Sequence, residues 1–131
     1  MLRGQRLFHD FRCDACHVPT LLTGDDQAFP ELAHQVIHPY TDLLLHDLGP
    51  GLADGRPVSG ASGAQWRTPP LWGIGLTAMV NPHRTFLHDG RARDLTEAVL
   101  WHEGEATTAR RRFSAAPRFD RDALIAFMQS L

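Results

Sequence analysis

The sequence predicts a single all-α domain with long irregular loops. Three segments carry the apolar periodicity of amphipathic helices, and they are residues 3–12, 94–103 and 120–131. The segments between them contain many glycine and proline residues, without an internal repeat or a second domain boundary. A chain of 131 residues with 43% hydrophobic residues fits one globular domain, which we assign to residues 1–131.

The first predicted helix has one apolar side, formed by Leu7, Phe8 and Phe11. Gly4 lies four residues before Phe8 and therefore shares its face. Because glycine weakens a helix, we expect Gly4 to mark a point at which another helix approaches closely. The last predicted helix has a similar stripe, formed by Leu124, Phe127, Met128 and Leu131. We expect these two helices to cross with Gly4 at the contact.

The segments between the helices are expected to be irregular. Residues 18–37 are predicted to form a loop, and residues 38–47 to form a stiff, extended passage. Residues 53–65 are rich in Gly, Ala and Ser, which is typical of an exposed, mobile loop. A short helix is predicted from about Pro69 to Gly75, because proline is well tolerated at the first positions of a helix.

The helix predicted from residue 94 has clear start and stop signals. Asp94 can cap it, and Glu97 three residues later completes a pattern that resembles a capping box. Gly104 can end it. The residues that share one face are Leu95, Ala98, Val99 and His102. His102 is therefore expected to face inward, where an imidazole without a partner would be costly.

Cys13, Cys16 and His17 form the pattern Cys-x-x-Cys-His, which is the attachment motif of a c-type haem. Each thiol adds to one vinyl group of the porphyrin, and the adjacent histidine then lies beneath the iron. We therefore expect Cys13 and Cys16 to hold one haem covalently, and His17 to be its proximal iron ligand.

Two other uses of the paired cysteines compete with haem attachment. A structural zinc site needs four ligands, and the chain has no third cysteine, so two histidines would have to complete it. A redox dithiol would follow a strand in a βαβ unit, whereas residues 3–12 are predicted to be helical. A zinc-binding structural module therefore stays an alternative to haem.

Composition and charge restrict the partners and the location. The net charge is -2 with neutral histidines, which does not favour nucleic acid or an anionic membrane as a partner. Residues 1–12 contain three arginines and no long apolar run, and no segment resembles a membrane span. Because haem is normally attached outside the bacterial cytoplasm, we expect a periplasmic location for a mature piece or the carboxy-terminal portion of a longer precursor.

Four further stretches match one family in the correct order. They are PYTDLLLHD at 39–47, WRTPPLWG at 66–73, LHDGRAR at 87–93 and AVLWH at 98–102. Together with the haem motif, they resemble the carboxy-terminal haem domain of the di-haem oxidoreductases, which are peroxidase-like and thiol-oxidoreductase relatives of bacterial di-haem cytochrome c peroxidase. The resemblance covers nearly the whole chain and implies a class I cytochrome c-like haem domain.

The resemblance also implies a second iron ligand. In the family, the sixth ligand of the electron-transfer haem lies fourteen residues after the histidine of the His-Asp-Gly motif. Fourteen residues after His88 is His102, which would give a bis-histidine haem with His17. Met79 is the alternative, and it would give a His/Met haem of higher potential. His88 itself is expected to have a structural place. Residues 81–86 depart from the Thr-x-Pro of the peroxidases, which argues against a calcium ion.

Other polar and aromatic residues are weaker candidates. Arg67 is expected to bind a haem propionate, because guanidinium matches carboxylate as a fork. Arg91 and Arg93 are less favoured, and solvated surface charge is the alternative for all three. The expected role of the tryptophans is packing in the core or at the haem edge, and they are Trp66, Trp72 and Trp101.

The expected function follows from an iron whose axial positions are both filled. A haem domain whose iron has both axial positions filled passes single electrons, either within a di-haem oxidoreductase or to one. Its partner would be a redox protein or a second haem domain, and we expect no catalytic residue in this chain. A peroxidase that acts on hydrogen peroxide after loss of the distal ligand is the enzymatic alternative.

Overall fold

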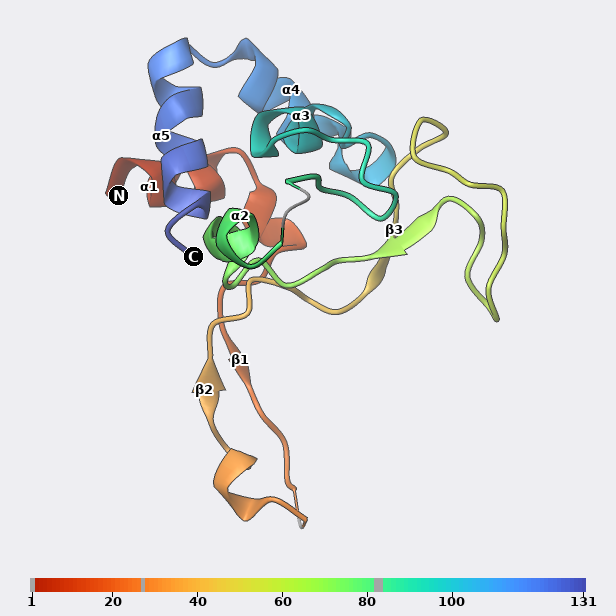
Figure 1. Ribbon diagram of the computed structural model, residues 1–131, viewed down its shortest axis with the longest axis vertical. Coiled ribbons are helices and arrows are strands. Elements are labelled where there is room, and N and C mark those ends of the chain that lie inside the picture. Colours follow the sequence, from red (N-terminus) through yellow and green to blue (C-terminus); the bar gives the residue numbers. More distant parts are fainter. Residues whose placement is uncertain (1, 27, 82–83) are drawn as a thin grey trace.

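The computed structural model describes residues 2–26, 28–81 and 84–131, and its framework is a pair of helices from opposite ends of the chain (Figure 1). Helix α1 (Leu2–Asp10) crosses helix α5 (Arg118–Met128). A Cβ atom on Gly4 would collide with the carbonyl oxygen of Ala123 and with Cβ of Phe127. The predicted crossing of the first and last helices at Gly4 is confirmed.

An aromatic core fills the space between this helix pair and its neighbours. Phe8 is 3% exposed, and its ring meets the Phe127 ring edge to face, with centroids 5.6 Å apart. Phe11 makes a similar contact with Phe113, which belongs to helix α4 (Thr107–Ala115) and is 1% exposed. Edge-to-face pairs at these distances add to the stability that burial provides. Leu124 completes the centre and is fully buried.

Two small antiparallel sheets make the prediction of an all-α domain wrong. Strand β1 (Leu21–Leu22) pairs with β2 (Val36–Ile37), and strand β3 (Leu45–Asp47) pairs with β4 (Gln65–Arg67). The sequence did not reveal them because strands of two or three residues are too short to show a period of two. The domain therefore mixes five α-helices with short strands in the part of the chain that is described.

The β1–β2 hairpin projects away from the helices (Figure 1). It occupies the segment that was predicted as a loop at residues 18–37, and its tip contains a 3-10 turn at Pro30–Leu32. At its base, the hydroxyl of Thr20 and Nδ1 of His38 are 3.0 Å apart. The hairpin is therefore inserted between His17 and residues 40–42. Residues 40–42 lie next to the haem motif again.

Helix α3 (Leu95–Leu100) is shorter than the helix predicted for residues 94–103. Its start agrees with the prediction, because the Asp94 carboxylate accepts a hydrogen bond from the backbone N–H of Glu97 at 2.8 Å. Its end comes earlier, with Trp101 as the capping residue. His102 therefore follows the helix instead of lying on it.

Two other helices differ from the prediction. The short helix expected at residues 69–75 is displaced toward the carboxy end, as a 3-10 turn at Ile74–Leu76 and helix α2 (Thr77–Val80). The sequence does not predict helix α4, because the segment is rich in arginine and has no apolar stripe. In the structure, its one buried residue is Phe113. Among the described residues, no helix combines the length and apolar character that a membrane span requires.

Candidate functional site

The two cysteines lie on a tight turn that directly follows α1. Cys13 opens a 3-10 helix (Cys13–Ala15), and the backbone N–H of His17 donates to the Cys13 carbonyl at 2.9 Å. Both thiols are half-buried and free of disulfide bonds. Burial raises the pKa of Cys13 to about 12, and burial also raises the pKa of Cys16. Both groups are therefore neutral thiols at pH 7.

The His17 ring is held by a backbone carbonyl. Its Nδ1 lies 3.0 Å from the carbonyl oxygen of Tyr40, so Nδ1 carries the proton and donates it. Tyr40 has a φ of 56°, and its ring packs edge-on against Phe8 and Phe127. Burial lowers the pKa of His17 to about 4. The imidazole is therefore neutral at pH 7, with its lone pair on Nε2.

His102 is held in the same way from the other side. It lies in the turn after α3, where its backbone N–H donates to Val99 and its Nδ1 donates to the Ala98 carbonyl at 2.7 Å. Burial lowers the pKa of His102 as well. This ring also presents a lone pair on Nε2, which is the arrangement usual for a metal-ligating histidine whose other nitrogen is fixed by a carbonyl.

The two imidazole rings lie at a distance that suits one metal ion, with their planes 47° apart. The ring centroids of His17 and His102 are 6.5 Å apart. Two imidazoles on opposite sides of one metal have centroids about 6 Å apart, because each metal–nitrogen bond is about 2 Å long and each nitrogen lies about 1 Å from its ring centre. The donor set of two neutral imidazoles and two neighbouring thiols therefore fits a covalently attached haem.

A group of polar residues that sequence reasoning missed lies beside Cys16. The His46 ring lies between two carboxylates, with Nε2 2.8 Å from Oδ2 of Asp42 and Nδ1 2.8 Å from Oε2 of Glu105. The hydrogen bond to Glu105 raises the pKa of His46. Donor atoms of Cys16, Asp42 and His46 all lie within 4.8 Å of one another. The sequence offered one signal for this group, because Asp42 and His46 lie four residues apart in the same motif at residues 39–47.

The alternative ligand Met79 lies on α2, where it is 82% exposed. His88 lies elsewhere, and its ring stacks on Trp66 with centroids 3.4 Å apart and planes 9° apart. Trp66 also donates from Nε1 to the Leu52 carbonyl at 3.1 Å. His88 therefore has a packing contact with Trp66, and the structure does not bring it together with His17 and His102.

The arginine candidates lie in different surroundings. Arg67 is exposed on β4. Nε of Arg91 donates to Asp89 at 2.6 Å, and the Arg91 guanidinium lies 4.9 Å above the Trp101 ring. Nε of Arg93 donates to Glu97 at 2.8 Å. Among the tryptophans, which were expected to pack in the core or at the haem edge, Trp72 is 52% exposed. Residues 82–83, within the stretch relevant to calcium, lie outside the described residues.

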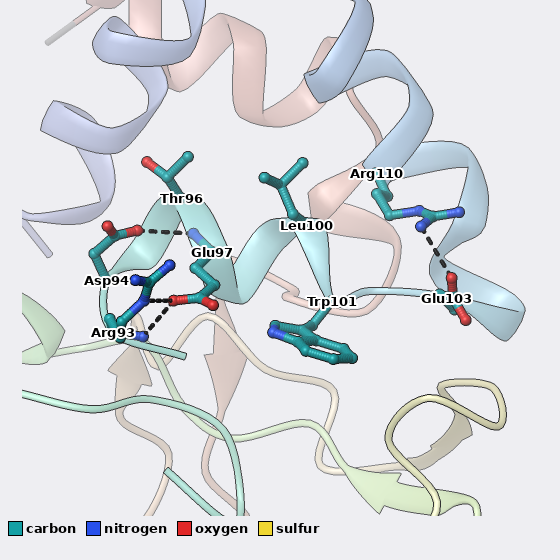
Figure 2. Close-up of a pocket in the computed structure, with 8 residues that line it drawn as sticks. All are labelled: Arg93, Asp94, Thr96, Glu97, Leu100, Trp101, Glu103 and Arg110. Carbon is teal, nitrogen blue, oxygen red and sulfur yellow. Dashed lines mark hydrogen bonds and ion pairs between the residues drawn. The ribbon is translucent and has the colours of Figure 1, made fainter. Parts of the chain in front are cut away.

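A cavity of about 510 Å³ lies on the outer side of α3, and Figure 2 shows its lining. Its charged side chains are largely paired with one another, through the contacts Arg93–Glu97 and Arg110–Glu103. None of the haem-motif residues, nor His102, is among the residues that line it. Neither histidine therefore lines this cavity, and the contacts in its lining fix the two ends of the α3 segment.

Comparison with known proteins gives one positive result. The family described as "Di-haem oxidoreductase, putative peroxidase" matches residues 1–131, which is the whole chain. Searches of curated proteins and of solved structures find no match.

Proposed function

The chain belongs to the di-haem oxidoreductase family, which implies a haem cofactor, and we propose that it is an electron-transfer domain holding one c-type haem. In this proposal Cys13 and Cys16 form the covalent links. His17 and His102 are the axial ligands. The bound haem would supply one-electron redox chemistry at its iron.

The observation that carries the proposal is the close pair of half-buried imidazoles, His17 and His102. His17 and His102 come from distant parts of the chain, and each is fixed through Nδ1 by a backbone carbonyl. A lone half-buried histidine with such a bond would need no further explanation. Two of them with centroids 6.5 Å apart and both Nε2 lone pairs available favour joint ligation of one metal.

The protein's own groups would set the properties of the site. The carbonyls of Tyr40 and Ala98 orient the two rings and keep the proton on Nδ1. The Phe8 ring packs edge-on against His17 with centroids 6.4 Å apart, and Phe127 packs in turn on Phe8. Two nitrogen ligands favour a lower potential than a His/Met pair.

The cysteine count indicates how the chain fits into its family. The chain contains two cysteines, which are enough for one covalently attached haem. A di-haem protein therefore needs a second haem-bearing domain, and we propose that this domain is the electron-transfer partner. We also propose a periplasmic location, because a c-type haem is normally attached outside the bacterial cytoplasm.

Reaction with small ligands tests electron transfer against peroxidase activity. With both axial positions occupied by side chains, the ferric haem-loaded chain should not bind cyanide and should not turn over hydrogen peroxide. The His102→Ala variant should bind cyanide, because it opens one axial position. Cyanide binding and rapid peroxide turnover by the unmodified chain would instead support the peroxidase alternative.

A further inference from the structure

We propose that the chain without haem binds one zinc ion through the Cys16 thiolate, the His46 imidazole and the Asp42 carboxylate. The site shares Cys16 with the haem motif but uses neither His17 nor His102. The proposal concerns the haem-free chain, and it would stand even if the haem assignment failed.

The three donor groups are already close to a coordination geometry. A sulfur, a nitrogen and an oxygen atom from Cys16, His46 and Asp42 lie within 4.8 Å of one another. Donor atoms around one tetrahedral zinc ion lie about 3.5 Å apart, since the bonds are about 2.0–2.3 Å long. A contraction of about 1 Å would therefore complete the site. The backbone N–H of Asp42 donates to the Cys16 carbonyl at 2.8 Å, which joins two of the ligands independently of a metal.

The histidine is oriented as a zinc ligand would be. Nε2 of His46 points toward Asp42, while Nδ1 lies 2.8 Å from Oε2 of Glu105. The other oxygen of Glu105 accepts from the backbone N–H of Asp47 at 2.9 Å, so the carboxylate is itself fixed. Once Nε2 gives up the proton in its hydrogen bond to Asp42, the carboxylate on Nδ1 holds the tautomer that binds metal through Nε2. Glu105 is thus a positioning residue.

The ligand types select the metal. Thiolate and imidazole favour zinc over calcium and magnesium, which prefer oxygen ligands. Three protein ligands leave a fourth position for water. When zinc binds, the Cys16 thiol would lose its proton to the solvent, and Nε2 of His46 would lose the proton that it donates to Asp42.

Zinc and haem would exclude each other at Cys16. A sulfur atom bonded to a porphyrin vinyl carbon is a thioether and no longer a thiolate ligand. Zinc bound to Cys16 would also prevent that thiolate from being oxidised to a disulfide with Cys13. The site would therefore protect the attachment motif until haem arrives.

Cobalt(II) is the probe for the test, because thiolate–cobalt bonds absorb light where the free ion does not. The full chain, produced without haem and kept reduced, should bind one cobalt ion with this absorption, and zinc should displace it. Cys16→Ser and His46→Ala should abolish the absorption, whereas Cys13→Ser and His38→Ala should retain it. Glu105→Gln should weaken binding about 10- to 100-fold, as loss of such an outer carboxylate typically does. The haem-loaded chain should show no thiolate–cobalt absorption.

Several results would overturn the proposal. Cobalt absorption that persists in His46→Ala, or that depends equally on Cys13 and Cys16, would indicate an unspecific dithiol site. Circular dichroism should be recorded with and without zinc, because metal binding can be coupled to folding. A chain that binds no zinc, whether folded or unfolded, would contradict the proposal.

Discussion

The imidazole rings of His17 and His102 lie with centroids 6.5 Å apart and planes 47° apart, and each ring is fixed through Nδ1 by a backbone carbonyl. One ring belongs to the Cys-x-x-Cys-His motif, and the other follows α3. Both are neutral at pH 7, because burial lowers both pKa values. The two histidines together therefore form a candidate metal site, with one ligand from the sequence motif and one from the segment after α3.

Removal of the cysteines tests the covalent attachment. Cys13→Ala or Cys16→Ala should leave the haem attached through one link, and the double variant should release all haem under denaturing conditions. Haem staining of a denaturing gel and the pyridine haemochrome spectrum give the measurement. Covalent haem in the double variant would show that the attachment lies elsewhere.

Gly4→Ala tests the helix crossing. The new Cβ would collide with Ala123 and Phe127, so we expect a loss of about 1–3 kcal/mol in the free energy of unfolding, measured in urea. Gly60→Ala is the matched control, because its Cβ would meet no atom within 4 Å. It should be neutral or stabilising by up to about 1 kcal/mol. Equal effects of the two substitutions would contradict the crossing.

Asp94→Ala tests the cap of α3. Loss of the hydrogen bond to the Glu97 N–H should cost about 1 kcal/mol of unfolding free energy, whereas Asp94→Asn should keep most of it. Asp122→Ala is a surface control, because Asp122 forms only a loose, exposed pair with Arg118. Its effect should stay within about 0.5 kcal/mol. A neutral Asp94→Ala would show that the cap does not stabilise α3.

Phe113→Ala tests whether α4 belongs to the core. Phe113 is 1% exposed and packs on Phe11, so its truncation should cost about 3–5 kcal/mol. Phe119 has the same side chain but is 70% exposed on α5, and Phe119→Ala should cost far less. Thermal or urea unfolding of both variants gives the comparison, and similar losses would place Phe113 outside the core.

Local sequence signals predicted the features that depend on neighbouring residues. Gly4 with the apolar stripes gave the crossing of α1 and α5, and Asp94 with Glu97 gave the start of α3. These signals work because spacing within one helix decides which residues share a face. The resemblance, rather than local pattern alone, singled out His102.

The rest of the structure depends on contacts between distant parts of the chain. The carbonyl of Tyr40 holds His17. This contact could not be predicted from the sequence, because every residue has a backbone carbonyl. Glu105 approaches His46 only because the segment after α3 folds back on β3. The two small sheets consist of strands too short for a period to show, so the all-α prediction failed there.

Magnetic circular dichroism of the ferric, haem-loaded chain tests the central proposal most directly, because it reports the axial ligands of the iron. We predict a low-spin signal of two imidazoles that is lost in His102→Ala and retained in His88→Ala and Met79→Ala. A methionine–iron signal, a five-coordinate iron, or a spectrum unchanged by His102→Ala would contradict the proposed ligation.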